Sequence, residues 1–146
     1  MESGSRGGGI RGNVNFIAVF LGALTFFVIG ALWYGPLFGK AWKDAVGYDG
    51  EKLPYPTSSN STPVIMGLAF LFELLVALML GHNIARTNPA PHVIMMMATG
   101  FAAAIMVPAL GIHYLFQQRP GKLFAIDAGY FVVGMAAMGG VFVAFS

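Results

Sequence analysis

One carboxylate, Glu73, stands near the middle of a long apolar segment, residues 64–84. An ionised carboxylate is among the costlier side chains to place at the centre of a lipid bilayer. No lysine or arginine lies at a comparable depth in the other apolar segments. We therefore expect Glu73 to be a neutral acid that donates its proton to a neighbouring acceptor. Two interpretations stay open, a polar tether between helices and a station for a proton or cation.

His113 and Asp127 lie seven residues before and seven residues after Pro120, which marks a short turn between two apolar segments. In an antiparallel helical hairpin these two positions lie at the same depth, about two turns from the loop. We predict that Asp127 pairs with His113, with Arg119 or Lys122 as competing partners from the turn. Such a pair could hold the hairpin together or relay a proton.

Other kinds of reactive site are not supported by the residues. The chain has no cysteine, which excludes disulfides, thiolate metal sites and cysteine nucleophiles. His82 and His92 flank one turn but lack the third ligand that a zinc site needs. Nucleophile elbows and phosphate-binding glycine loops are also missing. We expect no metal and no cofactor, and an enzyme is the least favoured class of function.

The composition predicts the elements that must position these residues. The chain is 57% hydrophobic and 10% charged, with a mean hydropathy of +0.72, and such a balance is typical of proteins surrounded by lipid. Four segments are long and apolar enough to cross a bilayer, namely residues 15–34, 64–84, 93–116 and 123–145. We predict an all-α membrane fold, an antiparallel bundle of four transmembrane helices forming one domain over residues 13–146. Residues 1–12 are predicted to be a flexible glycine-rich tail.

Several features predict where the helices end and how they pack. Gly35 and Pro36 should stop the first helix, and residues 37–46 should lie along the membrane surface. Residues 47–63 are rich in Pro, Ser and Thr and should form an irregular loop. Pro108 should kink the third helix. Close helix packing is expected at small residues spaced by four, which are Ala18 and Gly22 in the first helix and Ala136, Gly140 and Ala144 in the last.

Charge and aromatic residues indicate an orientation. One face of the predicted bundle carries five lysines and arginines, and the face with both termini carries three. The positive-inside rule then places the termini outside the cytoplasm. The five-charge face also collects aromatic residues that are expected to anchor it at the interface, namely Trp33, Tyr34, Trp42, Tyr114 and Tyr130. The lysines and arginines form no basic block, so nucleic acid is not an expected partner.

Two stretches carry a more specific pattern, GALWYGPLFGKAW at residues 30–42 and HYLFQQRPGKLFAIDAGYFVVGMAAMG at residues 113–139. Together they resemble the bacterial membrane-protein family called domain of unknown function 1761, in order and spacing from residue 13 to the C-terminus. The matching signature positions are Trp33, Tyr34, Pro36, Phe38, Gly39, Lys40, Trp42, Asp127, Gly129 and Tyr130. The resemblance implies a bacterial membrane protein of four helices and supplies no activity. Glu73 lies outside both motifs.

Two functions follow from these patterns. In the favoured one, the chain is a structural or accessory subunit that contacts copies of itself or another membrane protein within the lipid bilayer. In the alternative, it is a minimal proton-coupled carrier or a proton-conducting homo-oligomer that uses Glu73 and Asp127. Either function would place it in the inner membrane of a bacterial cell.

Overall fold

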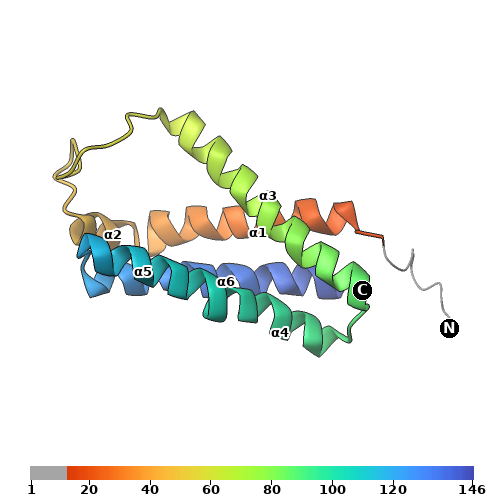
Figure 1. The fold of residues 1–146 in the computed structure, drawn as a ribbon. Helices are drawn as coiled ribbons and strands as arrows, with labels where there is room; N and C mark the ends of the chain where they lie inside the picture. Colours follow the sequence, from red (N-terminus) through yellow and green to blue (C-terminus); the bar gives the residue numbers. More distant parts are fainter. Residues whose placement is uncertain (1–12) are drawn as a thin grey trace.

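The computed structural model of the chain describes residues 13–146, and every regular element in this range is a helix (Figure 1). The tail predicted at residues 1–12 lies outside the described residues. In chain order the elements are α1 (Phe16–Leu32), the π-helical η1 (Trp33–Leu37), α2 (Gly39–Val46), α3 (Thr62–Thr87), α4 (Pro91–Phe101), the π-helical η2 (Ala102–Met106), α5 (Val107–Gln117) and α6 (Gly121–Ala144).

Four helical segments are long and apolar enough to cross a membrane, as predicted. They are Phe16–Leu37, Thr62–Thr87, Pro91–Gln117 and Gly121–Ala144. Each predicted boundary lies within three residues of the observed one. The first span is α1 continued by η1, and the third is α4, η2 and α5 in one continuous run.

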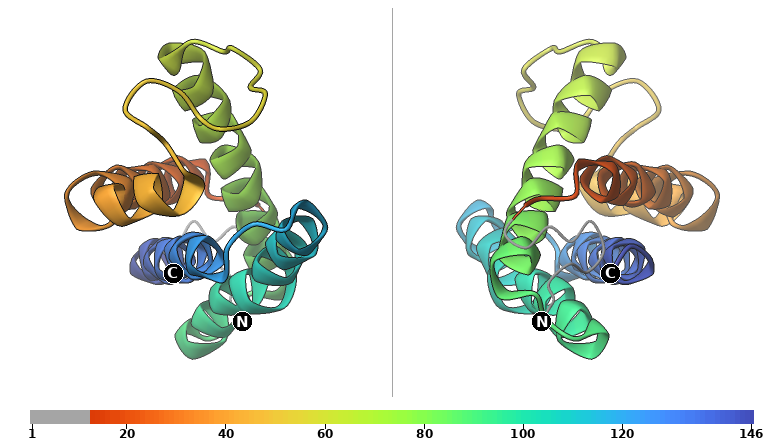
Figure 2. Two further views of the ribbon diagram at one scale, coloured as in Figure 1. Left: turned by 90° about the vertical axis from the view of Figure 1, so that its left-hand side faces the viewer. Right: turned by 90° about the vertical axis from the view of Figure 1, so that its right-hand side faces the viewer.

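The spans form an antiparallel bundle around α6. Figure 1 shows α1 and α6 side by side and running in opposite directions, with the first described residues and the C-terminus at the same end. Helix α6 also packs against α4, and α3 packs against α1. Helix α3 crosses the bundle obliquely, so its first residues, 62–68, lie apart from the other spans (Figure 2). The apolar side chains of this segment are exposed, among them Val64, Ile65, Met66 and Leu68.

The sequence predicted that the first span stops at Gly35 and Pro36, and this prediction is wrong. The span continues through a π-helical turn to Leu37, with the N–H of Phe38 donating to the carbonyl of Trp33 at 2.7 Å. Because Pro36 has no N–H, it cannot close an ordinary helical turn, and the wider π turn pairs other backbone groups instead. A Cβ on Gly39 would lie 2.6 Å from the Tyr34 carbonyl oxygen, so only glycine fits where α2 begins.

The third span carries a second π-helical turn, and it lies directly before a second proline. Segment η2 ends at Met106, and Pro108 follows near the start of α5. Pro108 cannot donate to the carbonyl of Ala104, so the ordinary hydrogen-bond ladder is interrupted at this point. The sequence predicted a kink at Pro108, and the structure has a π-helical turn on its N-terminal side.

Residues 48–61 form an irregular connection between α2 and α3, in agreement with the predicted loop. Within it, the backbone N–H groups of Lys52 and Glu51 donate to the Asp49 carboxylate, each at 2.9 Å. These bonds hold the pKa of Asp49 below its ordinary value. The Arg119 guanidinium lies over the Tyr55 ring at 3.9 Å, which joins the loop to the turn between α5 and α6.

The core lies where α1, α3 and α4 meet α6, and its fully buried large side chains are Phe26, Leu80, Ile94, Met135 and Met138. Ala18 and Gly22 are buried in α1, as expected. The small-residue stripe predicted for the last span does not pack inside this chain, because Gly140 and Ala144 are exposed; packing between protomers at this stripe stays a prediction. The buried glycines of α6 are Gly134 and Gly139, on the side of the helix that also carries Asp127 and Tyr130.

Candidate functional site

The carboxylate of Asp127 is buried in the second turn of α6, with 7% of the residue exposed. The hydroxyl of Tyr34, on η1, donates to Oδ1, and the hydroxyl of Tyr114, on α5, donates to Oδ2. Both carboxylate oxygens are therefore hydrogen-bonded. Through this one side chain the first, third and fourth spans are joined.

The predicted pairing of Asp127 with His113 is wrong. His113 is exposed, and no hydrogen bond joins it to Asp127 in the part of the chain that the structure describes. Successive residues on an α-helix point about 100° apart, so His113 and Tyr114 cannot both face α6. The structure turns Tyr114 inward. Arg119 does not reach Asp127 either, since its Nε donates to Gln117 at 3.0 Å.

The side chain of Tyr34 is held from two sides. The Tyr130 ring meets its ring edge-on at a centroid distance of 5.5 Å, and the Trp42 ring does so at 6.0 Å. Next to it, Trp33 donates its indole N–H to the Ile126 carbonyl at 2.9 Å. The π-helical turn lets both Trp33 and Tyr34 contact α6.

Glu73 forms a second cluster with α6. The half-buried Glu73 lies near the middle of α3, and its Oε2 lies 2.6 Å from the Tyr130 hydroxyl. The same hydroxyl lies 2.9 Å from the carbonyl oxygen of Phe26 on α1. The other oxygen of Glu73, Oε1, is buried and has no hydrogen-bond partner. This cluster joins the second span to the first and fourth.

The tyrosines that the sequence assigned to the membrane interface have a different role here. Tyr130 is 7% exposed and lies in the core, so it is not an interface anchor. The hydroxyls of Tyr34 and Tyr114 point to Asp127 and not away from the bundle. The signal that could have found them is spacing, because Tyr130 follows Asp127 by three residues and so shares its helix face.

The signature positions from the two sequence motifs meet in one place. Trp33 fits against Gly129, where a Cβ would lie 2.8 Å from the indole ring. Phe38 packs against the Trp33 ring at a centroid distance of 4.7 Å. Lys40 is exposed, and nothing in the structure explains its place in the motif. Most signature residues therefore serve to bring η1 against the first turns of α6.

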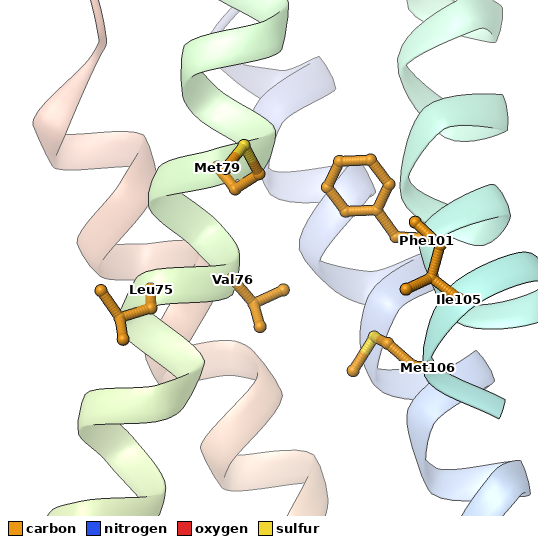
Figure 3. Close-up of a pocket in the computed structure, with 6 residues that line it drawn as sticks. All are labelled: Leu75, Val76, Met79, Phe101, Ile105 and Met106. Carbon is orange, nitrogen blue, oxygen red and sulfur yellow. The ribbon is translucent and has the colours of Figure 1, made fainter. Parts of the chain in front are cut away.

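A cavity of about 290 Å³ lies between α3 and the third span (Figure 3). Its lining is apolar and consists of Leu75, Val76, Met79, Phe101, Ile105 and Met106. Neither carboxylate is among these side chains. A lining of this kind offers no groups that could replace the hydration shell of an ion or a polar solute. Among residues 13–146, no group of three His, Asp or Glu side chains could hold a metal ion.

The fold and the site together define a four-span helical protein in which two carboxylates, the buried Asp127 and the half-buried Glu73, are bonded to tyrosines of neighbouring helices. The model of the family described as protein of unknown function (DUF1761) matches residues 17–143. The chain belongs to this family, which confirms the resemblance seen in its two motifs. No curated protein and no solved structure matches the chain.

Proposed function

We propose that this chain is a small multi-pass protein of the bacterial inner membrane that acts as a structural or accessory subunit. The observation that carries the proposal is how the two carboxylates inside the spans, Asp127 and Glu73, are used. Asp127 joins three spans and Glu73 joins three, so their hydrogen bonds are made with neighbouring helices of the same chain. Buried polar groups that satisfy one another in this way rigidify a bundle.

A surface available to a partner is the start of α3, residues 62–68. This segment lies apart from the other spans (Figure 2), and its apolar side chains are exposed. Gly67 lies within it, and a Cβ there would meet no atom within 4 Å. In a bilayer such a surface contacts either lipid or another transmembrane helix, and a small residue lets a second helix approach closely. We propose that the partner contacts residues 62–68 of α3.

The mass of the protein extracted gently from its own membrane tests this proposal. We expect a complex whose mass includes a different membrane protein. Gly67→Phe adds bulk to the surface of α3 without touching this chain, so it should release the partner while thermal stability stays unchanged. Gly140→Phe is the matched control, because Gly140 is also exposed with open space around its Cβ position. A mass made of copies of this chain alone would refute an accessory function with a different partner protein and would favour the homo-oligomeric candidate.

The second candidate is a proton-coupled carrier or proton-conducting homo-oligomer that uses Glu73 and Asp127. The buried, unbonded Oε1 of Glu73 favours it, since a carboxyl oxygen without a donor is unusual in a structure that serves packing alone. The apolar lining of the cavity favours the structural function.

A further inference from the structure

The Tyr130 hydroxyl lies between two oxygen atoms, and counting protons shows what this requires. Its oxygen is 2.9 Å from the Phe26 carbonyl and 2.6 Å from Oε2 of Glu73. A tyrosine hydroxyl has one proton to donate, and a carbonyl can only accept. If Glu73 were ionised it could also only accept, and one of the two contacts would lack a proton.

Both contacts become hydrogen bonds if Glu73 carries a proton. The acid then donates from Oε2 to the Tyr130 oxygen, and Tyr130 donates to Phe26. The unbonded Oε1 is in this case the carbonyl oxygen of a neutral acid. Leaving a neutral carbonyl unbonded in an apolar core costs less free energy than leaving a charged carboxylate oxygen unbonded.

We propose that Glu73 is a proton-binding site whose occupancy sets the direction of the Tyr130 hydroxyl. With the proton bound, Tyr130 donates to Phe26 and ties α6 to α1. When the proton leaves to water, the O–H bond of the acid breaks and the carboxylate accepts the hydrogen bond of Tyr130, which ties α6 to α3. The Phe26 carbonyl then keeps its place in the backbone ladder of α1.

The described helices around Glu73 offer no nearby cationic side chain that could balance a negative charge on its carboxylate. Helix α1, which packs against α3, has no ionisable side chain between Phe16 and Leu32. Asp127 on α6 is already bonded to two tyrosines. Apart from Tyr130, the other ionisable side chains of α3, α4 and α6 stand near helix ends, and they are His92 on α4, Lys122 on α6, and His82 and Arg86 on α3. A neutral state of Glu73 therefore requires a bound proton.

The Tyr130 hydroxyl fits against α1 because Gly30 has no side chain. A Cβ on Gly30 would lie 2.8 Å from the Tyr130 hydroxyl oxygen and 3.0 Å from the ring carbon that bears it. Gly30→Ala should therefore displace the hydroxyl from both the Phe26 carbonyl and Oε2 of Glu73, without adding or removing an ionisable group. Gly140→Ala is the matched control, because its added Cβ meets nothing within 4 Å.

Infrared difference spectroscopy of the full-length protein in lipid vesicles, recorded as the pH is raised, tests the proposal. At pH 7 we expect the band of a protonated carboxyl whose carbonyl accepts no hydrogen bond, and Glu73→Gln should abolish it. As this band disappears with rising pH, the C–O band of a tyrosine should change with the same midpoint. Tyr130→Phe should remove the tyrosine change, and Gly30→Ala should uncouple it from the carboxyl band, whereas Gly140→Ala should do neither.

Three results would overturn the proposal. They are an ionised carboxylate assigned to Glu73 at pH 7, a Glu73 band that persists at every pH at which the bundle stays folded, and a Glu73 titration without a change at Tyr130. Because the wild-type protein is measured directly, a variant that fails to fold does not remove the test. The site can bind a proton without moving it across the membrane. The proposal therefore does not depend on which of the two candidate functions is correct.

Discussion

Substitution of Asp127 should lower the stability of the bundle, because hydroxyl groups from two other spans donate to its carboxylate. Asp127→Ala would leave Tyr34 and Tyr114 without an acceptor inside the bundle. We expect a loss of stability on the order of 1 to 3 kcal/mol for each unsatisfied partner, with partial relief if water enters. Thermal unfolding in detergent measures this loss.

His113→Ala is the control for Asp127→Ala. His113 lies next to Tyr114 in sequence, but it is exposed and is not bonded to Asp127 in the described residues. Its removal should change the unfolding temperature little, and the two substitutions should be additive. Strong coupling between them would restore the pairing predicted from the sequence and contradict the structure.

Single residues of the site could be predicted where their chemistry contrasts with the surroundings. Glu73 and Asp127 are carboxylates inside apolar segments, which mark them as buried polar sites. Their partners could not be found in this way, because a tyrosine near a span end is equally typical of an interface anchor. The direction of Tyr34 depends on the π-helical turn at Pro36, and no local pattern indicated that turn.

At the scale of elements, α6 packs closely against α1 because Gly134 has no side chain at the contact. A Cβ on Gly134 would overlap the Phe26 ring, whereas a Cβ on Gly140, in the same helix, would meet nothing within 4 Å. Gly134→Ala should therefore destabilise the bundle by about 1 to 3 kcal/mol through overpacking. Gly140→Ala should be neutral or slightly stabilising. Unfolding curves of the two variants that coincide would show that this contact does not limit the approach of α1 to α6.

The four spans could be predicted because length and hydropathy are sufficient to define a membrane helix. Their inner faces were harder to predict. Apolar residues occur on every side of each helix, because both lipid and the protein core accept them. In the sequence, the stripe of Gly140 and Ala144 therefore looks the same as the buried Gly134 and Gly139. Polar residues supply the missing signal, because Asp127 and Tyr130 mark the buried side of α6.

For the whole molecule, the even number of spans places both ends of the bundle on one side (Figure 1). Five lysines and arginines on the opposite face against three on the terminal face predict that the termini lie outside the cytoplasm. A reporter that is active only in the cytoplasm, fused after Ser146, should stay silent. The same reporter inserted in the loop at Ser59 should be active. The reverse pattern would invert the bundle without changing its four spans.

The central claim is that the two carboxylate clusters hold the bundle together and do not conduct protons across the membrane. Proton flux into vesicles that contain the purified protein, driven by an imposed pH gradient, tests this most directly. We predict a flux no greater than that of vesicles with Glu73→Gln or Asp127→Asn, even though Asp127→Asn lowers the unfolding temperature. A wild-type flux that both substitutions abolish, in protein that remains folded, would contradict the claim and make the proton-conducting function the correct one.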